Sequence, residues 1–224
     1  MPTFNRRVFV RQAIRYFLRQ DYANRELIVL DDGDDPIEDL VPQDARIRYV
    51  RLNQKHTTGA KRNIGCEKAM GEIIVHWDDD DWMADYRLRY QVQALQESQA
   101  DVCGLNMLLH YDLVTGKSWQ YVCPPEYPTW LAGGTLCYLK TLWRINRFPD
   151  RATGADLRFI WSDHPKKSLA LPDHTIYIAL MHPGNTSPRR VQHPAWQAYP
   201  ADSIRNLLGA DWQFYSDLSQ NNGA

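Results

Sequence analysis

The sequence predicts an α/β protein in which helices flank a mostly parallel β-sheet. Short β-branched runs at residues 26–30, 46–52 and 72–77 alternate with segments of helical periodicity, which is typical of β-α-β units. The first and last of these runs end in aspartates. Because open α/β sheets bind ligands at the carboxyl ends of their strands, we expect the chemistry of the protein at these two ends.

The expected elements follow in a regular order. The periodicity predicts a helix at about 10–18 with Asn5 as its cap, strands at 26–30 and 46–52, a helix at 59–70, a strand at 72–77, a helix at 84–98, and strands at 102–111 and 174–181. Beyond residue 112 the elements are shorter. No linker separates the two halves, so we expect two lobes of one domain.

Two cations open the helix expected at 59–70. Lys61 and Arg62 lie in its first turn. Positive charge at a helix N-terminus opposes the helix dipole, so a bound anion explains these residues better than helix stability does.

The strand at 72–77 ends in four consecutive carboxylates, Asp78 to Asp81, between Trp77 and Trp82. Adjacent carboxylates repel one another beside apolar surface unless water, a cation or a hydrogen-bonding ligand offsets the repulsion. Their hard oxygens suit Mg²⁺ or Mn²⁺. A solvated acidic turn without a ligand is the alternative, and the cluster alone does not decide between the two.

The composition is that of a globular domain without a strong charge bias. The chain has 224 residues, of which 44% are hydrophobic, and its net charge of −1 favours no nucleic-acid partner. We find no signal peptide and no apolar run near the roughly 20 residues that span a bilayer. Four widely spaced cysteines indicate reduced thiols in a cytoplasmic protein.

Six ordered motifs resemble the family two glycosyltransferases to about residue 190. They are PTFNR at 2–6, ELIVLDDG at 26–33, GAKRNIG at 59–65, DDDD at 78–81, GAD at 154–156 and HPGNT at 182–186. The resemblance implies a GT-A fold, in which a Rossmann-like, mostly parallel sheet flanked by helices joins a smaller mixed lobe.

The resemblance also implies a division of the chain. We expect one glycosyltransferase domain over residues 1–190, with a nucleotide-sugar-binding half at 1–111 and an acceptor and catalytic-base half at 112–190. The C-terminal extension at 191–224 has no motif that we can interpret.

The first half is implied to bind a UDP-, dTDP- or GDP-sugar. Asp31 would accept a hydrogen bond from the base, and Lys61 and Arg62 would neutralise the diphosphate. Asp78 resembles the first acid of the family's D-x-D pair, near the ribose, and Asp79 is expected among the donor contacts.

The second acid of the D-x-D pair is Asp80, which would be a direct ligand of a divalent cation, Mn²⁺ or Mg²⁺. This cation would stabilise the leaving nucleoside diphosphate. His182 would be a further metal or phosphate contact. A loop imidazole bonded to nearby backbone is the alternative for His182.

Asp156 matches the family's position for the general base that takes the proton of the acceptor hydroxyl. One displacement at the anomeric carbon implies an inverting transferase. Ala155 departs from the usual Glu-Asp pair, but the residue assigned the base is present. Without the resemblance, an acid in the first turn of a helix is the preferred explanation of Asp156.

The acceptor, a glycan or a lipid-linked sugar, is expected beside Trp130 and the pair Gly133 and Gly134. An indole can stack on a sugar, and core packing is the alternative. We expect a role in bacterial-type cell-surface glycan synthesis. A peripheral contact with the inner face of the membrane is left open.

Family members usually carry an apolar strand directly before the motif at 2–6, whereas this sequence begins at Met1. We therefore expect the first strand to be missing: either the chain is shortened relative to a longer natural protein, or another segment fills the gap. If neither holds, Ile28 and Ile74 would flank an unpaired slot. A nucleotide-sugar-binding protein without turnover is the alternative function. A sugar nucleotidyltransferase and a calcium-binding module are less well supported, because the sequence has neither a Gly-Gly-x-Gly-Thr-Arg loop nor EF-hand spacing.

Overall fold

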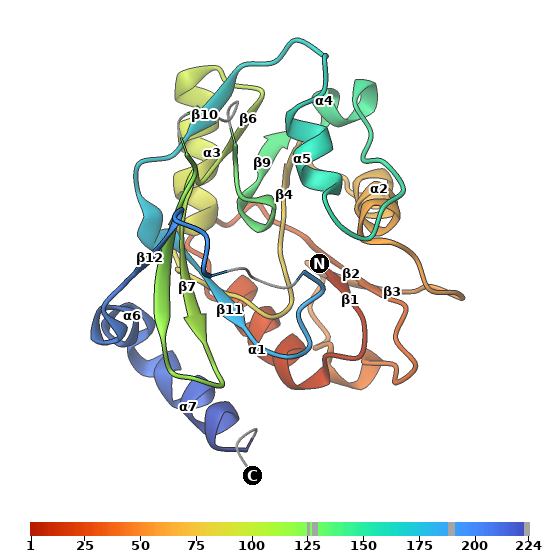
Figure 1. The fold of residues 1–224 in the computed structure, drawn as a ribbon. Coiled ribbons are helices and arrows are strands. Elements are labelled where there is room, and N and C mark those ends of the chain that lie inside the picture. Colours follow the sequence, from red (N-terminus) through yellow and green to blue (C-terminus); the bar gives the residue numbers. More distant parts are fainter. Residues whose placement is uncertain (125, 127–129, 188–190, 222–224) are drawn as a thin grey trace.

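The computed structural model describes residues 1–124, 126, 130–187 and 191–221, and it is a mixed α/β protein (Figure 1). The sheet nearest the N-terminus is entirely parallel. Its strands, in spatial order, are β1 (Pro2–Thr3), β2 (Leu27–Asp31) and β3 (Ile47–Arg51). All five residues of β2 are buried, as expected of a strand covered on both faces.

Two further sheets contain both parallel and antiparallel pairs. The second sheet has the order β10 (Ser168–Ala170), β6 (Val102–Gly104), β9 (Cys137–Leu139) and β4 (Ile73–Val75). The third has the order β12 (Trp196–Ala198), β8 (Ser118–Val122), β7 (Met107–Asp112), β11 (Tyr177–Met181) and β5 (Trp82–Met83). The pairs β6 with β10 and β7 with β11 are parallel.

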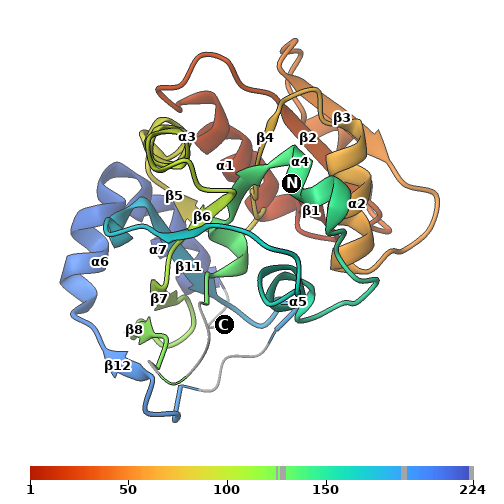
Figure 2. The ribbon, with the colours of Figure 1, turned by 90° about the horizontal axis from the view of Figure 1, so that it is seen from above.

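Seven α-helices of the described residues pack around these sheets. They are α1 (Arg7–Leu18), α2 (Thr58–Lys68), α3 (Arg87–Ser98), α4 (Lys140–Ile145), α5 (Ala155–Ile160), α6 (Ala201–Leu208) and α7 (Trp212–Asn221). Helix α2 packs against β1 and β2, and α3 packs against β6 and β9. Seen in two directions, α6 and α7 lie on the side of the molecule away from α2 (Figures 1 and 2).

The expected elements are present, apart from shifted ends and three local differences. In the strand expected at 174–181, residues His174–Ile176 form a 3-10 helix and β11 begins at Tyr177. The single strand expected at 102–111 is two strands, because the backbone of Leu105 bonds instead to the loop of Ala132 and Thr135. Asn5 is not the cap of α1. It adopts a left-handed conformation with φ of 55°, and its side chain bonds Asp34.

The slot expected between Ile28 and Ile74 is a cavity of about 670 Å³ lined by β2, β4, α2 and α3. The N-terminus lies between β4 and β1 in both views. Met1 continues the parallel ladder, since its nitrogen donates to the carbonyl of Ile28 and its carbonyl accepts from Leu30. Within the described residues, β4 pairs only with β9.

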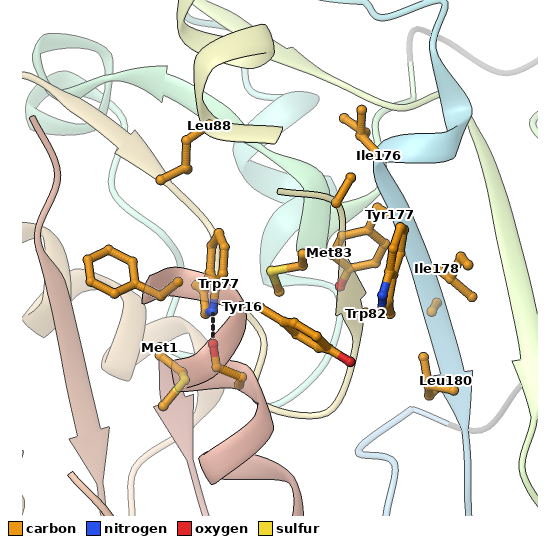
Figure 3. Packing of buried hydrophobic residues seen from close by; sticks show 14 of the residues in the cluster. Met1, Tyr16, Trp77, Trp82, Met83, Leu88, Ile176, Tyr177, Ile178 and Leu180 are labelled. Atoms are coloured by element: carbon orange, nitrogen blue, oxygen red, sulfur yellow. Dashed lines mark hydrogen bonds between the residues drawn. The ribbon is translucent and has the colours of Figure 1, made fainter. Parts of the chain in front are cut away.

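The C-terminal residues pack on the same core as the rest of the chain. Strand β12 pairs with β8, and the hydroxyls of Tyr215 in α7 and Tyr16 in α1 are 2.7 Å apart. The indole N–H of Trp77 donates to the carbonyl of Ala13 in α1, the bond that is dashed in Figure 3. All four cysteines are free thiols, and no helix in the described ranges is long and apolar enough to cross a membrane.

Candidate active site

The four carboxylates that follow β4 point to different partners. Asp79, Asp80 and Asp81 are buried, whereas about a quarter (26%) of the Asp78 side chain is exposed. The acidic run is therefore not a solvated turn. Its repulsion is offset by cationic and hydrogen-bonding side chains brought from four other segments.

Asp79 and Asp80 share one cation, Arg6, at the N-terminus of α1. Nη1 of Arg6 lies 2.8 Å from Oδ1 of Asp79 and 2.5 Å from Oδ2 of Asp80. Burial raises the pKa of Asp79, although Arg6 opposes this effect. Burial acts in the same direction on Asp80, but there the hydrogen bond from His182 and the charge of Arg6 outweigh it and lower the pKa.

Asp80 also joins the acidic run to the loop that follows β11. Its Oδ2 accepts from Nε2 of His182 and from Nδ2 of Asn185, each at 3.1 Å. The backbone N–H of Gly184 donates to Nδ1 of His182, which leaves the ring proton on Nε2, facing Asp80. The imidazole stacks on Phe9 with ring centroids 4.6 Å apart.

Asp81 is held by β11. Its Oδ1 accepts the backbone N–H of Leu180, and its Oδ2 accepts the hydroxyl of Tyr177. The same hydroxyl is 3.3 Å from Oδ2 of Asp78. Burial and the neighbouring charges of Asp80 and Asp78 raise the pKa of Asp81 well above its usual range.

Arg62 connects Asp78 with Asp156, two residues that are far apart in the sequence. Its guanidinium makes an ion pair with Asp156, and its Nη2 is 3.9 Å from Oδ1 of Asp78. Arg62 is buried at the first turns of α2, and this burial lowers its pKa. Asp156 lies in the first turn of α5. Its place therefore fits both explanations given for it, an acid that stabilises a helix N-terminus and the expected general base.

The glycine pair lies against these carboxylates. A Cβ at Gly133 would come within 2.1 Å of the Asp156 carboxylate, and a Cβ at Gly134 would come within 2.5 Å of Asp78. The buried Arg87 of α3 donates to the carbonyls of Gly134 and His76 and so fixes the glycine loop beside the end of β4.

Two of the expected donor-binding residues have internal partners. The carboxylate of Asp31 accepts from the backbone N–H groups of Gly33 and Ile37 and from the hydroxyl of Tyr49. Nζ of Lys61 donates to Asp32 at 2.6 Å and to the carbonyl of Thr3. Of the two helix cations, Arg62 is the one that faces Asp78 and Asp156.

Trp130 is half-buried, three residues before the glycine pair. Its ring packs edge to face against Tyr121, with centroids 5.0 Å apart, and Tyr121 in turn packs against Trp196. Trp130 thus belongs to an aromatic cluster on the side of β8, adjoining the loop that contacts Asp156.

A divalent cation is compatible with the chemistry of the Asp80 region. Asp80 and His182 offer an oxygen and a nitrogen, and Oδ2 of Asp79 is a buried oxygen without a hydrogen-bond partner in the described part of the chain. These ligand types suit Mn²⁺. They are not gathered as a ready cage, because no three His, Cys, Asp or Glu side chains of the described ranges converge on one point. Arg6 supplies the positive charge there.

The sequence interpretation missed several residues of the site. Arg6 lies inside the motif at 2–6, which was a usable signal. Asn185 likewise lies inside the motif at 182–186. Tyr177 and Arg87 had no such signal, since a tyrosine in a buried strand and an arginine in an amphipathic helix are ordinary features.

Two solved structures with a similar fold are complexes with nucleotide sugars. Staphylococcus aureus TarS, residues 1–349, in complex with UDP-GlcNAc, aligns with a TM-score of 0.66 at 18% identity, covering 83% of this chain and 58% of that one. Mannosyltransferase PcManGT from Pyrobaculum calidifontis, in complex with GDP-Man and Mn²⁺, aligns with a TM-score of 0.62 at 15% identity, covering 98% and 71%. The fold is therefore of the GT-A type.

The sequence itself places the chain more narrowly. A model of Glycosyl transferase family 2 matches residues 1–150, and the chain belongs to this family. A Campylobacter jejuni GalNAc(5)-diNAcBac-PP-undecaprenol beta-1,3-glucosyltransferase is 37% identical over 111 residues, which are 46% of this chain and 36% of that protein. The putative colanic acid biosynthesis glycosyl transferase WcaA of Escherichia coli K12 is 39% identical over 93 residues, which are 39% and 33% of the two chains. The alignments span less than half the length of these relatives.

Proposed function

We propose that this protein transfers a sugar from a nucleoside diphosphate donor to an acceptor hydroxyl with inversion at the anomeric carbon. The observation that carries the proposal is the position of Arg62, which pairs with Asp156 and faces Asp78. A buried cation between two partly exposed carboxylates suits a site that takes a diphosphate on one side and a hydroxyl on the other.

Arg62 is the residue that we assign to the diphosphate. A guanidinium can bind phosphate oxygens through two parallel hydrogen bonds. In the absence of a donor its partner is Asp156. Binding of the diphosphate would therefore draw Arg62 away from Asp156 and leave that carboxylate free to accept a proton.

Asp156 is the proposed general base. The acceptor oxygen forms a bond with the anomeric carbon while the bond from that carbon to the phosphate oxygen breaks, and the hydroxyl proton passes to Asp156. Because a single displacement attacks from the face opposite the leaving group, the product has inverted configuration. Gly133 leaves the space in which the carboxylate lies.

Asp80 and His182 are the residues proposed to hold a divalent cation. When bound, Mn²⁺ or Mg²⁺ would act as a Lewis acid on the leaving phosphate oxygen. PcManGT is in complex with Mn²⁺, which supports the use of a divalent metal in this fold.

Calorimetric titration with UDP, GDP and dTDP, each with and without Mn²⁺, tests the donor site. We expect one nucleotide to bind in a metal-dependent manner, and Asp80→Ala to abolish that dependence. Asp156→Asn should retain nucleotide binding but lose transfer of sugar to a panel of oligosaccharide and polyprenyl-diphosphate-linked acceptors. The configuration of the product, read by proton NMR, tests inversion.

A nucleotide-sugar-binding protein without turnover is the second candidate. The cavity between β2 and β4 favours it, because Arg62 and Asp78 are among the residues that line this cavity. Binding of a nucleotide by the wild type without transfer to any acceptor would select this function. Absence of binding for all three nucleotides would contradict both candidates.

The acceptor is proposed to be a glycan or a lipid-linked sugar in bacterial cell-surface glycan synthesis. The two relatives named for lipid-linked glycan and colanic acid assembly support this class. The aromatic cluster of Trp130, Tyr121 and Trp196 offers ring faces and edges beside the glycine loop.

A further inference from the structure

Arg6 is the most heavily engaged side chain in the acidic cluster, and the proposed reaction assigns it no role. Nη1 bridges Asp79 and Asp80, while Nη2 donates to the carbonyl of Gly184 at 2.7 Å and lies 3.4 Å from Oγ1 of Thr186. One guanidinium thus ties the end of β4 to the loop after β11, and its own bond to Gly184 spans 178 positions of the sequence.

We propose that Arg6 is a positioning residue that acts as a built-in counter-cation, competing with the divalent metal for Asp80 and pinning the loop at 182–186 while the metal is absent. The inference rests on the proposed metal-assisted function. It assigns to Arg6 control over how tightly the metal binds.

The competition between Arg6 and the metal follows from the number of donors already bound to one oxygen of Asp80. Oδ2 of Asp80 accepts from Nη1 of Arg6, Nε2 of His182 and Nδ2 of Asn185. A carboxylate oxygen has about two lone-pair sites, so this atom has no capacity left for a metal. Binding of a cation at this oxygen must displace a donor, and a fixed positive charge is the donor that a second cation repels most strongly.

The same displacement would release the loop. Arg6 is the link from α1 to the backbone of Gly184, and the neighbouring residue Phe9 stacks on His182. When a metal takes over Asp80, His182 can remain at the site as a ligand, whereas the bonds of Arg6 to Asp79 and Gly184 have to rearrange. Metal binding and the conformation of residues 182–186 are therefore coupled through Arg6.

The test measures Mn²⁺ binding without nucleotide, from the loss of the free-ion EPR signal, in the wild type, Arg6→Gln and Arg6→Lys. Arg7→Gln is the matched control, because Arg7 is the adjacent arginine and pairs with Asp35 and Asp39 on the surface. Removal of the charge in Arg6→Gln should tighten Mn²⁺ binding at least about fivefold. Arg6→Lys keeps the charge and should stay within about twofold of the wild type, as should Arg7→Gln.

Hydrogen exchange of the peptide at 182–187 supplies a second readout. Without metal, exchange there should be faster in Arg6→Gln and Arg6→Lys than in the wild type, since neither side chain reproduces the guanidinium fork. Arg7→Gln should leave it unchanged. In the wild type, addition of Mg²⁺ should speed exchange in this peptide.

Weaker or equal Mn²⁺ affinity in Arg6→Gln, with the wild type binding normally, would overturn the inference alone. If neither protein binds Mn²⁺, both the inference and the metal part of the proposed function fail. If Arg6→Gln does not fold, either of two results would overturn the inference. One is hydrogen exchange at 182–187 in Arg6→Lys that is no faster than in the wild type. The other is no change in wild-type exchange at 182–187 when Mg²⁺ is added.

Discussion

Gly133 and Gly134 each leave the space of a methyl group to a carboxylate of the proposed site, Asp156 and Asp78 respectively. The Cβ of an alanine at 133 would overlap Asp156, and at 134 it would overlap both the Tyr177 hydroxyl and Asp78. Both glycines have ordinary backbone angles, so close approach rather than conformation requires glycine here.

We therefore expect the two alanine variants to fail in different ways. Gly133→Ala displaces the proposed base and should lower kcat about 10- to 100-fold with little change in nucleotide affinity. Gly134→Ala displaces Asp78 and should weaken metal-dependent nucleotide binding about tenfold. Calorimetry and transfer assays separate the two effects.

Gly71→Ala is the control for this pair, because a Cβ there meets only the carbonyl of Ile73 at 3.5 Å. It should retain both binding and kcat. Equal loss of nucleotide affinity in Gly133→Ala and Gly134→Ala would mean that the loop moves as a unit and that the individual contacts are unimportant.

At the scale of an element, α3 supports the site through one buried cation. Arg87 is fully buried, donates to the carbonyls of His76 and Gly134 and to Gln91, and lies over the rings of Trp77 and Tyr177. Without the guanidinium, the buried carbonyl of His76 and the partly buried carbonyl of Gly134 lose this donor. Arg87→Met should lower the free energy of unfolding by about 2–4 kcal/mol, measured by urea denaturation.

The neighbouring Arg89 provides the comparison on the same helix. It pairs with Asp21 at 2.8 Å, and 52% of its side chain is exposed. Arg89→Met should change the free energy of unfolding by less than about 0.5 kcal/mol. If both variants are equally stable, Arg87 does not hold the glycine loop.

Helix α7 is docked through a buried tyrosine. The Tyr215 ring is buried, and its hydroxyl is 2.7 Å from that of Tyr16. Tyr215→Phe removes only this hydrogen bond and should lower the free energy of unfolding by about 1 kcal/mol. Tyr215→Ala leaves a cavity as well and should lower it by about 3–5 kcal/mol.

The exposed Gln213 in the same helix serves as the reference, and Gln213→Ala should be nearly neutral. Denaturant titrations of the three variants would show whether α7 unfolds with the core. A separate low-stability transition, unaffected by Tyr215→Ala, would contradict docking of this helix.

At the scale of the whole molecule, the gap between β2 and β4 makes stability depend on pH. The amine of Met1 lies in this gap, and burial lowers its pKa from 8.0 to about 5, although Asp78 and Asp79 oppose the shift. The unfolded amine binds a proton at higher pH than the folded one does. The free energy of unfolding is therefore unaffected by this group above about pH 8, and it decreases as the pH falls from 8 toward 5.

Between pH 8 and pH 5 the free energy of unfolding should decrease by on the order of 3–4 kcal/mol, because each unit of pKa shift corresponds to about 1.4 kcal/mol. Urea denaturation of the free-amine protein between pH 5 and 8, compared with the N-terminally acetylated protein, measures it. Acetylation removes the titrating amine, so the difference between the two slopes isolates Met1 from all carboxylates and histidines. Identical slopes would mean that the amine is hydrated in the gap.

Much of the fold and part of the site could be predicted from sequence because they depend on local rules. Alternating β-branched runs and amphipathic segments specify strands and helices wherever they are packed, and aspartates after the strands expected at 26–30 and 72–77 mark the strand ends where a ligand is expected. The break at Leu105 could not be predicted, because its backbone partners are Ala132 and Thr135, about 30 residues away.

The sequence alone thus determined the family, the fold class and the residue types that can carry the chemistry, since motifs and periodicity are local properties of the chain. Only the tertiary structure decided the partners. It brought Arg62 to Asp156, placed Arg6 between the acidic run and Gly184, and engaged Lys61 internally with Asp32. These pairings depend on how the strands order in space, and residue spacing in the sequence carries no record of that order.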